Sequence, residues 1–193
     1  MAKTGMRYVV AAKLKQENNG ALPTYENGMV IGRAISAEVS LTRTESSLYA
    51  DDVLAESENA ITGGNISIGM DDILEDAQEI VFGLVKTGNE GSYEYDDKAV
   101  GAPYVGVGYL QERRFRGVVS YMPYWYYKVQ FAPMDDRAQT RGEQVEWQTT
   151  TASGTMMGVV KDSSQIATFR THKVCATAEE AVEWLNQMAG ITA

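Results

Sequence analysis

Residues 118–131 have the sequence VVSYMPYWYYKVQF. The odd positions from Val119 to Phe131 are almost all apolar, whereas the even positions, such as Ser120 and Lys128, are amphipathic. This period of two is typical of a strand with one buried face, and aromatic and β-branched side chains fit a pleated surface. We therefore predict a long strand here, paired through a tight turn at Gly117 with another strand over residues 104–116.

The same alternation recurs elsewhere in the chain. Apolar residues occupy the even positions from Met6 to Leu14, which predicts one buried and one solvent-facing side. Further along, one buried face is expected to be shared by Ile31, Ile35, Ala37, Val39 and Leu41. The expected strands are 6–14, 31–43, 65–70, 143–151 and 165–174. Asn-Gly and Asn-Asn-Gly sequences within residues 17–28 predict turns between the first two.

One helix is predicted in the middle of the chain, over about residues 72–86. Apolar residues from Ile73 to Val85 recur at the spacing of one helical face. Asp71 and Asp72 are suited to its amino end, and Gly88 follows its carboxyl end.

A second helix is predicted over residues 178–189, after a capping box that begins at Thr177, and Gly190 ends it. The order of elements has no strand–helix–strand rhythm and no repeat of fixed period. The sequence therefore predicts a mainly β (α+β) fold, an antiparallel β-sandwich or barrel flanked by the 72–86 helix, as one domain over residues 1–193.

Length and charge limit the classes of function. The 193 residues suit one compact domain, and the 17 basic and 26 acidic side chains give a formal net charge of −9. This acidity argues against tight binding to a nucleic-acid backbone. The sequence contains no apolar run of 18 residues or more, so no membrane insertion is expected, and the amino end lacks the apolar stretch of a secretion signal.

Few residues are suited to catalysis or metal binding. Four Asp-Asp pairs, at 51–52, 71–72, 96–97 and 135–136, lack the spacing of a calcium loop and are expected to be solvated. His172 and Cys175 are three residues apart on a predicted strand and face opposite sides, so we expect a surface histidine and a buried thiol. We therefore expect no enzymatic activity, no catalytic residue, no metal and no cofactor.

Two further patterns have competing interpretations. Gly106 and Gly108 are not followed by a helix, so they indicate close backbone approach rather than a phosphate loop. The cluster Arg113, Arg114 and Arg116, with Lys128 across the hairpin, could bind nucleic acid beside stacking tyrosines. Given the net charge, we favour contact with an acidic neighbouring subunit. The aromatic surface at 121–127 is also expected to need covering, by another subunit if not by the same chain.

Three blocks of the sequence resemble a known family. These are LYADDVLAES at 48–57, ITGGNISI at 61–68 and DDIL at 71–74. The order resembles that of the major tail proteins, or tail tube proteins, of long-tailed, non-contractile bacteriophages. The Tyr-Ala-Asp-Asp sequence at 49–52, followed by Ala-Glu at 55–56, is the most specific part of the resemblance.

The resemblance implies a β-sandwich flanked by a helix, related to the tube protein of type VI secretion. It also implies a structural virion protein, made and assembled in the host cytoplasm, whose homo-hexameric rings stack into a hollow tube. DNA would pass through the lumen without specific binding. The implied partners are a tape-measure protein inside the tube and tail-tip and tail-terminator proteins at its ends. The immunoglobulin-like domain that many relatives carry at the carboxyl end is not expected here.

The resemblance also gives hypotheses for contact residues. The polar segment 44–59 would act as a contact arm between subunits or rings, with Tyr49, Asp51, Asp52 and Glu56 on it. Residues 2–7 would act similarly through Arg7, and the arginines at 113, 114 and 116 would meet an acidic neighbour. Neighbouring subunits would continue one sheet into a barrel, and six copies of an acidic subunit would repel phosphate from the lumen.

Two other classes of function remain as alternatives. The first is a small-molecule-binding β-barrel of lipocalin type, in which the face at 119–131 lines a pocket. The second is a hydrolase that uses Asp51 or Asp52 with a divalent cation.

Overall fold

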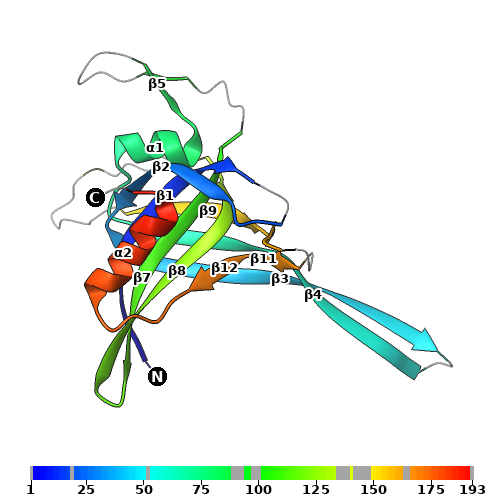
Figure 1. Ribbon diagram of the computed structural model, residues 1–193. Coiled ribbons are helices and arrows are strands. Elements are labelled where there is room, and N and C mark those ends of the chain that lie inside the picture. Colours follow the sequence, from blue (N-terminus) through cyan, green and yellow to red (C-terminus); the bar gives the residue numbers. More distant parts are fainter. Residues whose placement is uncertain are drawn as a thin grey trace.

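The computed structural model describes residues 2–17, 20–50, 53–87, 94–96, 101–133, 140, 149–162 and 166–191. The chain is mainly antiparallel β-structure with two helices, so the predicted fold class is confirmed (Figure 1).

The strands form two layers that share one continuous path of hydrogen bonding. The first layer has the order β2-β1-β7-β8 and the second has the order β9-β4-β3. The two join where Phe131 of β8 pairs with Gly154 of β9. The strands of these layers are β1 (Ala2–Gln16), β2 (Thr24–Gly32), β3 (Ala34–Ala50), β4 (Val53–Met70), β7 (Tyr104–Phe115), β8 (Val118–Phe131) and β9 (Thr150–Met157).

Shorter strands pair at the margins of the two layers. β12 (Arg170–His172) pairs with residues 124–126 of β8. The same edge of β8 pairs with β9 further along, over residues 128–131. The remaining pairs are β5 (Val85–Thr87) with β6 (Glu94–Asp96), and β10 (Val159–Val160) with β11 (Ala167–Thr168). The strand expected over 165–174 is thus two short strands. Of the strand expected over 143–151, residues 143–148 lie outside the described residues, and β9 begins at Thr150.

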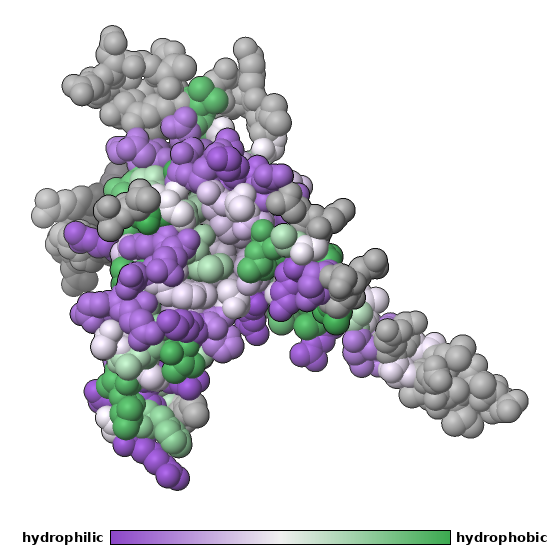
Figure 2. Space-filling model, in the orientation of Figure 1, coloured by the Kyte–Doolittle hydropathy of each residue, from purple (hydrophilic) through white to green (hydrophobic). Residues whose placement is uncertain are grey.

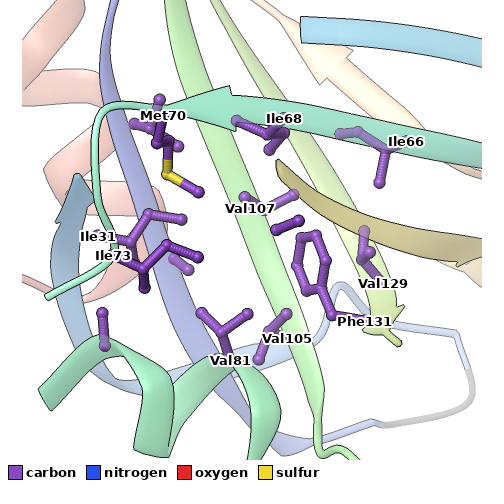
Figure 3. Close-up of a cluster of buried hydrophobic side chains, with 14 of the residues drawn as sticks. Ile31, Ile66, Ile68, Met70, Ile73, Val81, Val105, Val107, Val129 and Phe131 are labelled. Carbon is purple, nitrogen blue, oxygen red and sulfur yellow. The ribbon is translucent and has the colours of Figure 1, made fainter. Parts of the chain in front are cut away.

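The first hydrophobic core lies between the two layers (Figure 3). Val107 and Val129 of the first layer face Ile66 and Ile68 of the second. Helix α1 (Glu75–Phe82) packs beside them and contributes Val81. The sandwich is therefore closed by burial of branched aliphatic side chains from both layers, which is the main stabilising contribution in such folds.

The second core lies on the outer face of the first layer, under helix α2 (Ala178–Ala189). Leu185 of α2 and Trp125 of β8 are fully buried there. Gly108 permits this close approach, since a Cβ at that position would lie 2.7 Å from both Leu185 Cδ2 and Trp125 Cε3. The expectation that the strand glycines mark close backbone approach is confirmed.

A bulge in β8 divides its aromatic residues between the two cores. Val105 pairs with Val129 but Val107 pairs with Tyr126, so β8 contains one extra residue between these pairs. Tyr127 consequently faces α2, whereas Phe131 faces the core between the layers. The prediction that the odd positions of 118–131 share one face is wrong, because the bulge reverses the alternation.

Strand β1 is buried on both faces, not on one. Val9 faces the core between the layers, and Val10 faces α2. Ahead of them, Tyr8 has a φ of 57° and is the extra residue between the pairs Arg7–Leu110 and Val10–Gly108. This bulge, together with the cover that α2 gives to the outer face, explains why the middle of the strand lacks the predicted solvent-facing side.

The strand predicted over 31–43 is interrupted. The Asp71 carboxylate accepts a hydrogen bond from the Arg33 backbone N–H at 3.0 Å, where β2 ends and β3 begins. Two residues later, Ile35 is bulged between the pairs Ala34–Met70 and Ser36–Gly69. Its side chain is therefore 52% exposed instead of sharing the buried face of Ile31.

Strand β2 was not predicted, because the Glu-Asn-Gly sequence at 26–28 indicated a turn. In the structure, Asn27 has a φ of 54° inside the strand. One extra residue lies here opposite β1, between the pairs Ala11–Met29 and Lys13–Glu26. The same backbone preference that makes Asn-Gly common in turns therefore produces a bulge.

The two helices differ in how well the sequence predicted them. Helix α2 has the predicted bounds, and the Thr177 hydroxyl accepts a hydrogen bond from the Glu180 N–H at 3.2 Å. Helix α1 is shorter than the predicted 72–86 span. Gly83 adopts a φ of 73° and ends it early, and residues 85–87 form β5 instead.

We expect Ile68 and Ile35 to respond very differently to truncation. Ile68→Ala removes a fully buried side chain and should lower the free energy of unfolding by about 2–5 kcal/mol. Ile35→Ala removes a bulged, exposed side chain and should change it by less than about 0.5 kcal/mol. Urea unfolding of both variants checks this pair. Equal losses would contradict the bulge at Ile35.

We expect stability to fall in alkali because of Tyr109. Burial raises the pKa of this phenol, and the neighbouring Tyr126 hydroxyl, 3.2 Å away, adds to the effect. An unfolded tyrosine ionises near pH 10, so the stabilisation is complete below about that pH. Above it, stability should fall by about 1.4 kcal/mol per pH unit.

Denaturant unfolding between about pH 8 and pH 11 measures this slope. Tyr109→Phe should flatten it, whereas Tyr104→Phe, at an exposed tyrosine of the same strand, should leave it unchanged. An unaltered slope in the Tyr109 variant would show that this phenol is not protected.

Candidate assembly surfaces

The β3–β4 hairpin extends well beyond the body of the protein (Figure 1). Its ladder runs from the pair Ala34–Met70 to the pair Ala50–Val53. Strand β9 pairs with β4 only over residues 64–70, so the outer hairpin consists of two strands without a third. We call residues 44–59 the arm. The sequence suggested an irregular polar segment there, but the strands continue, because the polar residues still pair through their backbones.

Four of the predicted contact residues fall on the arm. Tyr49 pairs with Leu54, and Glu56 pairs with Leu48, through the backbone ladder. Asp51 and Asp52 lie outside the described residues. Residues 44–59 contain five carboxylates and no basic residue, which makes the arm strongly acidic.

The polar side chains described on the arm contact one another across the ladder. Ser57 Oγ donates a hydrogen bond to Glu45 Oε1 at 3.3 Å, and the Thr44 and Thr62 hydroxyls lie 3.4 Å apart. Both pairs are exposed to solvent. Contacts of this kind contribute little net stability in water.

Strand β3 is the end strand of the sheet. It pairs with β4 on one side, and no other strand in the described part of the chain pairs with its outer edge. A long edge strand presents unpaired N–H and C=O groups that can pair with another chain. The outer edge of β3 and the arm thus form a continuous surface suited to strand addition.

A second extension, the flap, is formed by residues 2–7 of β1 and the β7–β8 hairpin over residues 110–121 (Figure 1). Its tip is a tight turn in which Arg116 has a φ of 48° and Gly117 a φ of 83°. Two consecutive residues with positive φ define the type I′ turn that suits a hairpin. The predicted hairpin turn at Gly117 is confirmed.

The flap carries all four predicted contact arginines, three of them near its tip and Arg7 at its base. Ala2 pairs with Arg114 and Lys3 with Arg113, so the amino end of the chain lies along the arginine cluster. The Arg7 guanidinium lies 5.4 Å from the centre of the Tyr121 ring. In contrast, Lys128 forms an ion pair with Glu17 and is not part of the cluster.

Exposed apolar side chains accompany the arginines at the tip. Phe115 is 46% exposed and Val118 is 68% exposed. Arg114 and Arg116 are also exposed, with Arg116 lying 5.3 Å from the Phe115 ring centre. Figure 2 shows hydrophobic and hydrophilic side chains intermixed on this extension. Such a mixture of aromatic and arginine side chains is typical of the centre of protein interfaces.

The aromatic face at 121–127 is covered by the chain itself. Trp125 and Tyr127 are buried beneath α2. The Tyr25 hydroxyl donates to the Tyr127 carbonyl at 2.7 Å, and the Tyr25 ring meets Trp125 edge-on at 5.1 Å. Of the two kinds of cover that we expected for this face, the same chain supplies it, because α2 packs over these residues.

The residues considered for chemistry are dispersed. His172 is exposed, with its ring 5.5 Å from that of Tyr124, whereas Cys175 is buried. Burial raises the pKa of the Cys175 thiol, which keeps it protonated. Backbone hydrogen bonds, first from Arg33, lower the pKa of Asp71. Among the described residues, no three His, Cys, Asp or Glu side chains come together as a metal site.

Comparison with known proteins gives no assignment. No protein-family model matches the chain, and no curated protein matches its sequence. In the described part of the chain, neither helix has the length and apolar character needed to cross a membrane. The two extensions, the arm and the flap, are therefore the features from which a function can be argued.

We expect the arm to exchange its backbone hydrogens faster than the rest of β4. In the described part of the chain no third strand pairs with its two strands, and isolated hairpins are marginal in water. In the monomer, amides of residues 46–57 should be unprotected, whereas those of residues 66–70 should be protected. Hydrogen exchange with mass spectrometry measures both. Strong protection of 46–57 in the monomer would contradict an arm that is ordered by assembly.

Proposed function

We propose that this protein is a structural subunit of a bacteriophage tail tube, in which hexameric rings stack into a hollow conduit for DNA. The observation that carries the proposal is the β3–β4 hairpin, which projects from the sandwich and along whose outer half no third strand pairs among the described residues. A hairpin so placed gains stability when strands of another copy pair with it. The sandwich flanked by helices agrees with the fold that the sequence resemblance implies.

The charges of the two extensions support assembly from copies of one chain. The arm is acidic, with five carboxylates in residues 44–59. The flap carries Lys3 and Arg7 as well as the three arginines at its hairpin. Surfaces of opposite sign on one molecule favour heterologous contacts, which generate rings or filaments rather than closed two-fold dimers.

The overall charge suits a conduit for DNA. A subunit with a net charge of −9 contributes a field that repels phosphate, and six copies in a ring would multiply it. Free passage requires that the cargo is not bound, and the acidic balance provides this. In this role the tube would enclose a tape-measure protein and meet tail-tip and tail-terminator proteins at its ends.

The alternatives have less support. A lipocalin-like barrel would use the aromatic face at 119–131 to line a pocket, but Trp125 and Tyr127 pack against α2. The hydrolase alternative depends on Asp51 or Asp52, which lie outside the described residues, whereas in the pair that is described Asp71 accepts hydrogen bonds from the backbone N–H groups of Arg33 and Asp72. We therefore propose no enzymatic activity.

We expect the purified, concentrated protein to form regular hollow rods in negative-stain electron microscopy. A variant in which residues 46–57 are replaced by Asn-Gly should remain folded, because residues 64–70 of β4, which pair with β9 in the sandwich, are retained. It should form no rods, since the arm is lost. Circular dichroism and sedimentation of the variant provide the control for folding. Rods of normal length from the shortened variant would refute the role of the arm, and a compact monomer at every concentration would refute the proposal.

A further inference from the structure

A groove runs between the base of the flap and helix α2. Tyr8 of β1 forms one side, and Val182, Asn186 and Ile191, from α2 and the residues after it, form the other. Two carboxylates, Glu179 and Glu183, stand exposed at its rim on α2, and Arg7 lines it on the β1 side. The groove therefore combines apolar side chains with a rim that is acidic along α2.

The groove is held in place by the bulge in β1. Tyr8 adopts a φ of 57°, a conformation uncommon for a bulky residue, and its hydroxyl donates to Asn186 Oδ1 at 2.7 Å. This hydrogen bond connects the strand to the helix across 178 positions of sequence. The shape of the groove is thus fixed by the fold before any partner binds, which lowers the entropy lost on binding.

The tip of the flap has the complementary chemistry. From Arg113 to Tyr121 the chain has three arginines and no carboxylate. Phe115 and Val118 are exposed on either side of the turn, and Phe115 lies between Arg114 and Arg116 in the sequence. Apolar side chains beside guanidinium groups are complementary in chemistry to apolar side chains beside the carboxylates of α2.

The tip cannot reach the groove of its own chain. The groove lies at the level of Arg7, which pairs with Leu110, and the turn at Arg116 is six residues further along the strand. At the rise of a β-strand this distance is about 20 Å. Because the tip is part of a paired ladder, it does not fold back, and Phe115 stays exposed in the single chain.

We infer that the flap tip of one copy, with Phe115 and Val118, docks into the groove between Tyr8 and α2 of a second copy. Arg114 and Arg116 then meet Glu179 and Glu183. This contact joins two different surfaces of the same chain, so every added copy offers a fresh tip and a fresh groove. The inference rests on the proposed self-assembling function and names a contact separate from the arm.

Cysteine cross-linking tests the contact directly. Val118→Cys chains mixed with Gln187→Cys chains should form a disulfide-linked pair under mild oxidation, seen on a non-reducing gel. The native Cys175 is buried and should not interfere. The control is Val118→Cys with Glu75→Cys, an exposed position on α1, which should give no linked pair.

Charge reversal tests the same contact by sedimentation velocity. The variants R114E/R116E and E179R/E183R should each weaken self-association by about tenfold. An equal mixture of the two should recover part of it, because one reversed tip then faces one reversed groove. The matched control is E75R/E79R, which reverses two exposed glutamates with the same spacing on α1 and should leave association unchanged.

The outcomes separate this contact from the proposed function. If rods form but no cross-link is seen and E179R/E183R associates as strongly as the unaltered chain, the docking is overturned. The proposed tube function then still stands. A specific cross-link with charge-swap recovery but no rods supports the docking and counts against the tube. A chain that stays monomeric at every concentration overturns both.

Discussion

The fold depends on a change of partner along one strand. Along one edge of β8, residues 124–126 pair with β12 and residues 128–131 pair with β9. The bulge before Val129 accompanies this change and places Tyr127 and Phe131, both at odd positions, on opposite faces. The sheet can therefore pass from one layer to the next, with one core between the layers and another beneath α2. Both extensions of the molecule are anchored in these cores.

The extensions share a physical feature, since each continues a well-packed ladder past the end of its hydrophobic support. The arm continues β3 and β4 beyond β9, and the flap continues β1, β7 and β8 beyond α2. Backbone pairing alone contributes little net stability in water, so such extensions gain most by contact with another molecule. Their opposite charges are the reason for proposing a second copy of the same chain as the partner.

The acidic character of the protein is unevenly spread, and this matters for assembly. Carboxylates predominate on the arm and on α2, whereas the flap is basic. A net charge of −9 alone would make copies repel each other, which favours solubility over association. Attraction between the acidic and basic surfaces can outweigh this repulsion only at separations shorter than the Debye length, where salt screens the charges least.

The sequence by itself determined the fold class, the bounds of β7, β8 and α2, and the turn at Gly117. These depend on periodicity and capping, which are local properties. Only the tertiary structure decided the bulges at Tyr8, Asn27 and Ile35, the early end of α1, and the burial of the aromatic face beneath α2. A bulge depends on the pairing of a strand with its neighbour, and burial depends on which segment packs above it. Neither the arm's continuous ladder nor the groove beside Tyr8 could be predicted, because both arise where residues far apart in sequence meet.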